Sequence, residues 1–139
     1  MSQESAESLI KAAGNKDPEA AFKVAVGLTK GKYGLKRSPD KALKYFKIAA
    51  DSGNIDAINR YADIQMQNKK YDDASKYYQL GIKKKSPYSM VAYGKYLQDI
   101  EHNDEKSAKF FKAASDLKDP EGMYYYASVL FQQAKNDQA

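Results

Sequence analysis

The sequence predicts an all-α fold, an α-α superhelix of about three helix-turn-helix repeats with a half-repeat at each end. Three observations predict this fold. Two sequence patterns alternate along the chain, each pattern recurs at intervals of 32 to 37 residues, and a proline or a capping residue marks most of the expected helix starts. Because 139 residues leave room for one domain, we expect residues 1–139 to form a single repeat domain.

The first pattern predicts four helices with one apolar face, which we call the A helices. They are expected to begin at Pro18, Ile55, Pro87 and Pro120, directly after Asp17, Asn54, Ser86 and Asp119. These four preceding residues are favourable N-caps, and a proline at the first helical position loses no hydrogen bond. Apolar residues recur at the fourth and seventh positions and a small residue at the eighth, as in Val24 and Ala25 of the first A helix.

The second pattern predicts three B helices, within residues 41–54, 73–86 and 106–119. Each carries a small residue, two adjacent rings and another small residue at helical spacing, as in Ala42, Tyr45, Phe46 and Ala49. A small residue lets a ring on the neighbouring helix approach closely, so A and B helices are expected to pack in pairs. These pairs give repeats at about 18–54, 55–86 and 87–119, with half-repeats at 4–17 and 120–135.

The first full repeat also carries small, basic and aromatic residues in a characteristic order: Gly31, Gly34, Leu35, Ser38, Lys41, Ala42, Tyr45, Ala49, Ala50 and Gly53. In this order it resembles a Sel-1-like repeat, a helical-hairpin relative of the tetratricopeptide repeat. The loops expected at 67–72 and 99–104 are shorter and nearer the tetratricopeptide form, so both subfamilies stay open for the second and third repeats. The resemblance implies a right-handed superhelix whose A helices line a concave groove that holds peptides or partner proteins and performs no catalysis.

If the A helices line such a groove, the side chains pointing into it fall at the second, fifth, ninth and twelfth positions of each A helix. The candidate partner-binding residues at these positions are Phe22, Val26, Asn59, Asp63, Met66, Tyr88, Val91, Lys95, Gln98, Tyr124 and Ser128. Their mixture of rings, a methionine and polar groups suits an amphipathic peptide. We therefore expect a protein or peptide partner, bound by a chain that acts as an adaptor or scaffold.

Lysines recur on the B helices and form a second candidate surface, a basic face on the convex side of the superhelix. They are Lys41, Lys44, Lys47, Lys76, Lys106, Lys109 and Lys112, in a chain of net charge +5. This basic face offers an alternative function, the charge-driven binding of nucleic acid or an anionic membrane. No arginine and aromatic pattern accompanies the lysines, and lysines near helix C-termini also stabilise the helix dipole. We therefore rank nucleic acid and membranes below a protein partner.

The sequence offers no catalytic or metal-binding pattern. With no cysteine, thiolate metal sites, iron–sulfur clusters and cysteine nucleophiles are excluded. His102 stands alone in a polar stretch, and Asp72, Asp73, Asp104 and Glu105 lie at expected B-helix starts, where acidic residues stabilise the helix dipole. We therefore expect no enzyme activity, cofactor, metal or small-molecule substrate. The acidic start of the chain and the lack of a long apolar run predict a cytoplasmic protein.

The last expected A helix, at 120–135, keeps its rings, although terminal repeats of a solenoid normally turn a polar face to solvent. Its apolar residues are Met123, Tyr124, Tyr125, Tyr126, Val129, Leu130 and Phe131, more than one neighbouring hairpin can cover. We expect this helix to be a contact surface for self-association, for a partner or for further repeats. Tyr125, Val129 and Phe131 are the residues expected to make that contact.

Overall fold

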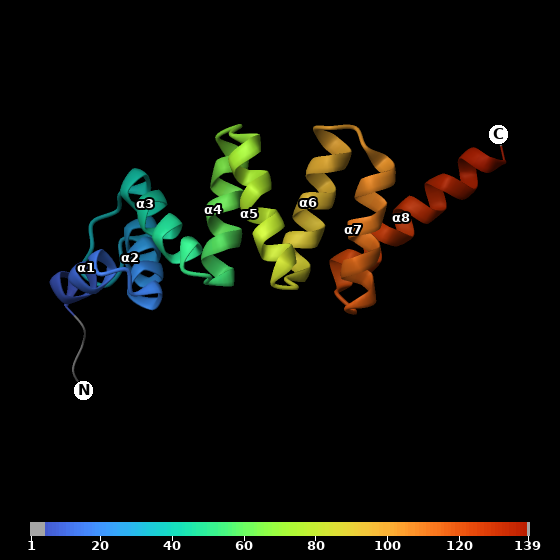
Figure 1. Ribbon diagram of the computed structural model, residues 1–139. Coiled ribbons are helices and arrows are strands. Elements are labelled where there is room, and N and C mark those ends of the chain that lie inside the picture. The colour runs from blue at the N-terminus through green and yellow to red at the C-terminus, as the bar shows by residue number, and fades with distance from the viewer. Residues whose placement is uncertain (1–4, 139) are drawn as a thin grey trace. The chain divides into compact units, whose positions relative to one another are not determined.

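The structure, a computed structural model, describes residues 5–138 and contains eight α-helices and no strand in that range (Figure 1). The helices are α1 (Ala6–Gly14), α2 (Pro18–Lys30), α3 (Pro39–Asp51), α4 (Ile55–Gln67), α5 (Tyr71–Lys83), α6 (Pro87–Asp99), α7 (Asp104–Asp116) and α8 (Pro120–Asp137). The predicted all-α repeat fold is confirmed. The A helices are α2, α4, α6 and α8, and the B helices are α3, α5 and α7. Helix α1 lies in the first half-repeat, whose expected start at residue 4 falls outside the described range.

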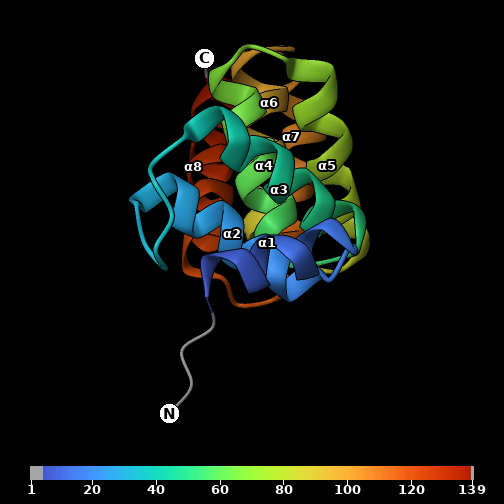
Figure 2. The ribbon, with the colours of Figure 1, turned by 90° about the vertical axis from the view of Figure 1, so that its left-hand side faces the viewer.

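The chain divides into two compact units, and the division falls within α5, between Tyr77 and Tyr78. In the first unit, α2 packs against both α1 and α3, and α3 also packs against α4 (Figure 2). In the second unit, α7 packs against both α6 and α8. Each unit therefore contains A–B helix pairs of the predicted kind.

The N-caps predicted for the A helices are confirmed by their hydrogen bonds. Backbone N–H groups donate to these side chains at the following N···O distances: Ala20 to Asp17 (3.2 Å), Ala57 to Asn54 (2.9 Å), Ser89 to Ser86 (3.3 Å) and Gly122 to Asp119 (3.0 Å). Each bond satisfies a backbone donor that has no partner within the helix. The cap, followed by a proline in three of the four helices, therefore fixes where the A helices begin.

The turn before each A helix also repeats. The residue before each N-cap has a left-handed backbone, with φ of 65° at Lys16, 96° at Gly53, 61° at Lys85 and 63° at Lys118. The N-cap residue then donates its backbone N–H to the carbonyl five positions earlier, as Asp119 does to Ala114 at 3.2 Å. Three of the four left-handed positions hold lysine although glycine is less strained there. The turn from a B helix to the next A helix therefore requires a left-handed backbone even where the residue is lysine, which does not favour that conformation.

The core of the first unit shows how small residues and rings pack between helices. Ala21 and Ala25 of α2 are completely buried, and Phe46 of the adjacent α3 is 1% exposed. The ring of Phe46 also meets the ring of Phe22 edge to face, with centroids 6.0 Å apart. The pairing of small residues with rings that the sequence predicts is therefore present in the α2–α3 hairpin.

Candidate functional site

The second unit contains an open cleft of about 450 Å³ between its two A helices, α6 and α8, at the end where α7 begins. Nine side chains line the cleft: Gln98, Asp104, Tyr124, Tyr125, Ser128, Val129, Gln132, Gln133 and Asn136. Seven of the nine belong to α8, so this helix provides most of the surface. The cleft is the candidate functional site.

Helical periodicity on α8 explains the composition of the cleft. Tyr124, Ser128, Gln132 and Asn136 are four residues apart and therefore lie along one side of the helix. Beside this row, Tyr125 stacks on the buried ring of Phe111, with centroids 5.2 Å apart, and Val129 also packs against the core. The cleft therefore has an apolar floor anchored to the core, and carboxamides are the commonest polar groups around it.

Two charged side chains lie in or beside the cleft. Asp104 is the one charged residue among the described residues that line it. Lys95 of α6 lies with its Nζ 5.0 Å from the ring centroid of Tyr125. A hydrogen bond with Tyr125 raises the pKa of Lys95, burial opposes the increase, and the negative charges of Glu121 and Asp99 add to it. Lys95 therefore stays protonated beside the floor of the cleft at neutral pH.

The structure brings together three of the predicted groove residues, since Gln98, Tyr124 and Ser128 all line the cleft. Lys95 contacts the cleft residue Tyr125, and Tyr88 is 51% exposed on the same helix as Lys95. Val91 requires a correction, because it is only 3% exposed and packs with Phe111 in the core of the second unit. Val91 therefore offers little surface to a partner.

The remaining groove candidates lie in the first unit. Phe22, Val26, Asp63 and Met66 are partly buried, and Asn59 is buried at 9% exposure. The ring of Phe22 is occupied by two contacts, with Phe46 and with the guanidinium of Arg60, whose Cζ lies 5.6 Å from the ring centroid. Asn59 offers little surface to a partner.

Six cleft residues were not among the predicted candidates: Asp104, Tyr125, Val129, Gln132, Gln133 and Asn136. The last three lie beyond the twelve-residue pattern on which the groove positions were counted. A signal was available, because the four-residue spacing from Tyr124 and Ser128 continues to Gln132 and Asn136 with no proline or glycine to stop the helix. Asp104 was interpreted only as a residue that stabilises the start of a helix.

Comparison with known proteins places this architecture in a family. The family model of the Sel1 repeat matches residues 18–54 and 77–119, which together make up more than half of the chain. The chain belongs to the Sel1 repeat family. Residues 55–76, in the second repeat, lie outside both matches. No curated protein was found to match the sequence.

Two solved structures share the fold of this Sel1 repeat chain. A Sel1 repeat protein from Oxalobacter formigenes is 17% identical with a TM-score of 0.80, and the alignment covers 88% of this chain and 53% of that one. A protective antigen of uropathogenic Escherichia coli strains that displays an SLR fold is 13% identical with a TM-score of 0.77, with 91% and 28% covered. This chain therefore spans about half and about a quarter of the lengths of these proteins.

The seven lysines of the basic face of this Sel1 repeat chain are exposed, and five of them have local contacts. Lys47 pairs with Asp51 at 3.0 Å and Lys112 with Asp116 at 3.2 Å, both one helical turn apart. Three others lie over rings, with Nζ-to-centroid distances of 5.9 Å for Lys44 on Tyr45, 5.6 Å for Lys76 on Tyr77 and 6.0 Å for Lys106 on Tyr93. Exposed contacts of this kind contribute only about 0.2–1 kcal/mol each. These lysines are spread over three helices, α3, α5 and α7.

The first unit contains a cluster of titratable side chains joined by hydrogen bonds. The hydroxyl of Tyr61 donates to Asp73 Oδ2 at 2.6 Å, and Gln65 Nε2 donates to the same oxygen at 2.9 Å. The hydroxyl of Tyr77 donates to Asp51 at 2.5 Å, and the rings of Tyr61 and Tyr77 meet edge to face at 4.6 Å. The hydrogen bonds join α4 to α5 and α3 to α5, so the cluster holds neighbouring helices together.

The pKa values in this cluster follow from burial and hydrogen bonding. Burial raises the pKa of both Tyr61 and Tyr77, and the hydrogen bonds to Asp73 and Asp51 raise it further. Burial also raises the pKa of Asp73, but the hydrogen bonds from Tyr61 and Gln65, with the charges of Lys76 and Lys47, outweigh that effect and lower the pKa overall. Both tyrosines are therefore held as neutral donors and Asp73 as an ionised acceptor.

We expect these tyrosines to make the chain lose stability in alkali. Well below pH 10 both tyrosines are protonated in the folded and unfolded states, so they add no pH dependence. As the pH rises through 10, the unfolded chain releases their protons while the folded chain retains them, so the free energy of unfolding should fall with a slope that approaches at most about 1.4 kcal/mol per pH unit for each tyrosine. Urea unfolding at several pH values between 9 and about 11.5 measures this slope.

The double variant Tyr61→Phe, Tyr77→Phe should lose most of this alkaline slope. Tyr124→Phe is the matched control, because that ring is 67% exposed and should leave the slope unchanged. Equal slopes in the wild type and the double variant would show that the two hydroxyls are not protected in the folded state.

Other expectations of the sequence concern metals and membranes. In residues 5–138 the structure contains no group of three or more His, Cys, Asp or Glu side chains placed to hold a metal ion. His102 is exposed, with a left-handed φ of 54°, in the turn between α6 and α7, as expected of a solvated turn residue. Within the same described range, no helix has the length and apolar character needed to cross a membrane.

Proposed function

We propose that this chain is a non-catalytic protein-interaction module whose A-helix groove binds a peptide segment of a partner, with the α6–α8 cleft as the principal contact site. Sel1 repeats typically serve as protein–protein interaction modules. The observation that carries the proposal is the cleft itself, where three residues predicted from the repeat pattern, Gln98, Tyr124 and Ser128, converge. Its size lies within the range of about 300–1,000 Å³ that is usual for binding pockets.

The chemistry of the cleft suits a peptide. Carboxamide side chains both donate and accept hydrogen bonds, so Gln98, Gln132, Gln133 and Asn136 can pair with the N–H and C=O groups of a peptide backbone. Tyr124, Tyr125 and Val129 supply an apolar surface for one or two side chains of the bound segment. Asp104 favours a basic residue at that end of the cleft.

The alternative function, binding of nucleic acid or an anionic membrane through the basic face, has weaker support. The lysines of that face are distributed over several helices, and Lys47 and Lys112 are paired with carboxylates. Phosphate binding releases counterions, so this alternative predicts an affinity that falls steeply with salt. Binding in the cleft predicts a weaker dependence on salt.

The experiment selects ligands from a display library of random short peptides on the immobilised chain and measures the affinity of the enriched peptides. Ser128→Tyr should weaken their binding by roughly tenfold or more, because the new ring fills the cleft. The Ser128 side chain is exposed and its hydroxyl donates only to the Tyr124 carbonyl of its own helix, at 3.0 Å, so the core is left intact.

Two controls complete this test. Lys109→Tyr places the same ring on the exposed basic face and should leave peptide affinity unchanged. The triple variant Lys44→Glu, Lys76→Glu, Lys109→Glu should also retain peptide binding. The proposal fails if Ser128→Tyr binds the peptides as well as the wild type does, or if generic RNA or anionic vesicles bind at physiological salt and the triple variant abolishes that binding.

A further inference from the structure

Helix α8 has a second apolar surface, which we call its outer face and define by Met123, Ala127, Leu130 and Phe131. Met123 is 43% exposed, Leu130 47% and Phe131 70%, and Ala127 is also exposed. With about 3.6 residues per turn, these residues lie on the side of the helix away from Tyr125 and Val129, which pack on the core. The outer face is therefore separate from the floor of the cleft.

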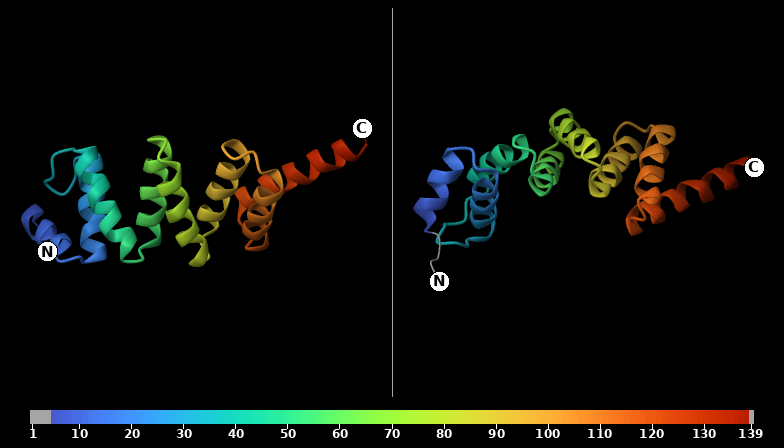
Figure 3. Two further views of the ribbon diagram at one scale, coloured as in Figure 1. Left: turned by 45° about the horizontal axis from the view of Figure 1, so that its top comes forward. Right: turned by 60° about the horizontal axis from the view of Figure 1, so that its bottom comes forward.

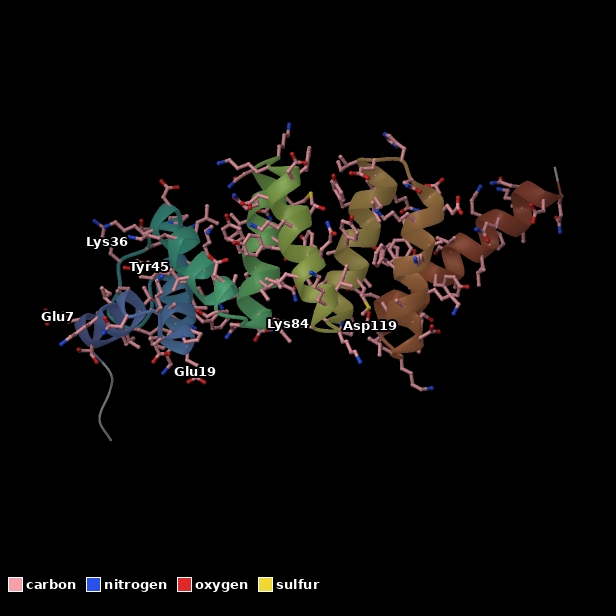
Figure 4. All side chains as sticks on the ribbon, viewed as in Figure 1. Glu7, Glu19, Lys36, Tyr45, Lys84 and Asp119 are labelled. Atoms are coloured by element: carbon pink, nitrogen blue, oxygen red, sulfur yellow. The ribbon has the colours of Figure 1, made fainter. Side chains whose placement is uncertain are left out.

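The C-terminal half of α8 projects away from α7 (Figure 3). Figure 4 shows side chains on both edges of this half in the view, while the labelled Asp119 lies at the turn from which the helix starts. The other A helix of this unit is α6. Its side that corresponds to the outer face of α8 has a neighbouring helix, because α6 packs against α7.

The repeat allows a position-by-position comparison of α8 with α6. Met90, Gly94 and Leu97 occupy the positions of Met123, Ala127 and Leu130, and all three are buried, Met90 at 7% and Leu97 at 0% exposure. Helix α7 covers part of this face, because an added Cβ at Gly94 would lie 2.6 Å from the ring of Phe111, and Met90 packs in the same core cluster as Phe111. The equivalent positions of α8 have no such cover.

The same comparison holds for α2 in the first unit. Ala21, Ala25 and Leu28 occupy these three positions and are 0%, 0% and 7% exposed. There α3 packs alongside α2, with the ring of Phe46 buried at 1% exposure. A B helix therefore lies beside the corresponding face in both units.

The two B helices that cover α2 and α6 share one pattern, a small residue, two adjacent rings and a second small residue: Ala42, Tyr45, Phe46 and Ala49 in α3, and Ser107, Phe110, Phe111 and Ala114 in α7. In each case both small residues and the second ring are at most 1% exposed. We propose that the outer face of α8 is a docking surface for an amphipathic helix of another protein that carries this small–ring–ring–small pattern. This interface would continue the α6–α7 interface by one repeat.

A second copy of the chain is poorly suited to supply that helix. The second ring of each pattern is already buried within its own chain, at 1% for Phe46, 3% for Tyr78 and 0% for Phe111. Helix α1 also packs as a B helix, but it has Ser8 and Leu9 in place of the two rings, and Leu9 is 2% exposed. A second copy of the described residues therefore has no unoccupied helix of the required pattern to offer.

The experiment titrates the intact chain into a fluorescently labelled peptide with the sequence of residues 103–118, which contains the pattern of α7, and follows anisotropy. Saturable binding is expected. Leu130→Asp and, separately, Ala127→Arg should weaken it by roughly tenfold or more, because each places a charge in an apolar contact. Ala127 is exposed, so its replacement leaves the fold intact, and circular dichroism verifies this for both variants.

Matched controls separate this docking surface from the cleft and from exchange with α7. Gln133→Asp and Ser128→Tyr change the cleft side of the same helix and should leave peptide binding unchanged. A peptide with both phenylalanines replaced by serine should not bind. The proposal is overturned if the wild-type peptide fails to bind, if Leu130→Asp and Ala127→Arg bind it as well as the wild type, or if sedimentation shows a dimer that Leu130→Asp dissociates.

Discussion

Replacing Phe111 by alanine is expected to lower the free energy of unfolding by about 3–5 kcal/mol, the usual cost of deleting a buried phenylalanine ring. The ring is 0% exposed and touches both neighbouring A helices. On one side it fills the space above Gly94 of α6, and on the other it stacks on Tyr125 of α8 at 5.2 Å. Because Gly94 has no side chain to move into the gap, a cavity should remain between the three helices.

Urea unfolding followed by circular dichroism measures this loss. Phe110→Ala is the matched control, since that neighbouring ring is only partly buried and meets Tyr93 edge to face at 5.0 Å. We expect a clearly smaller loss for Phe110→Ala. Equal losses for the two variants would contradict the central position of Phe111 in the core of the second unit.

The fold of this chain was predictable because its determinants are local and repeated. Asp17, Asn54, Ser86 and Asp119 each cap a helix at the predicted residue, and proline follows three of them. These signals act within one helical turn, so the sequence contains all the information that they need. The B-helix pattern of small residues and rings likewise predicts the close contact that the structure shows between Gly94 and Phe111.

The candidate site was only partly predictable, because it depends on how neighbouring helices are rotated against one another. Counting along α6 predicts Val91 in the groove, but this side chain is buried in the core cluster of the second unit. Asp73 was interpreted as a residue stabilising the start of a helix, yet it accepts hydrogen bonds from Tyr61 and Gln65 on the preceding helix. No local rule connects residues eight and twelve positions apart on two different helices.

The prediction for the C-terminal helix α8 is likewise confirmed for some residues and wrong for others. The expectation that α8 leaves rings exposed is confirmed, with Tyr124 at 67% and Phe131 at 70%. Of the three residues expected to make the outward contact, Phe131 is exposed, whereas Tyr125 and Val129 are partly buried against the core. Composition predicts how much apolar surface a helix carries, and the contact with Phe111 decides which side of that surface is covered.

A second large effect is expected at Gly122, where α8 approaches α7 closely. A Cβ added there would lie 2.6 Å from the Cβ of Ala114 and 2.8 Å from its carbonyl carbon. At Gly94 the nearest atoms belong to the ring of Phe111, which can rotate, but at Gly122 part of the obstacle is the backbone of α7 itself. Gly122→Ala should therefore lower the free energy of unfolding by about 1–3 kcal/mol, because α7 and α8 must move apart.

Gly14→Ala provides the matched control for this prediction, since Gly14 also lies in a helix but has nothing within 4 Å of its added Cβ. Alanine is the better helix former by about 1 kcal/mol, so Gly14→Ala should leave stability unchanged or raise it. Parallel urea unfolding of the two variants separates the steric cost at Gly122 from the gain in helix propensity. A Gly122→Ala protein as stable as the wild type would mean that α7 and α8 can separate without loss, and that their contact contributes little to the second unit.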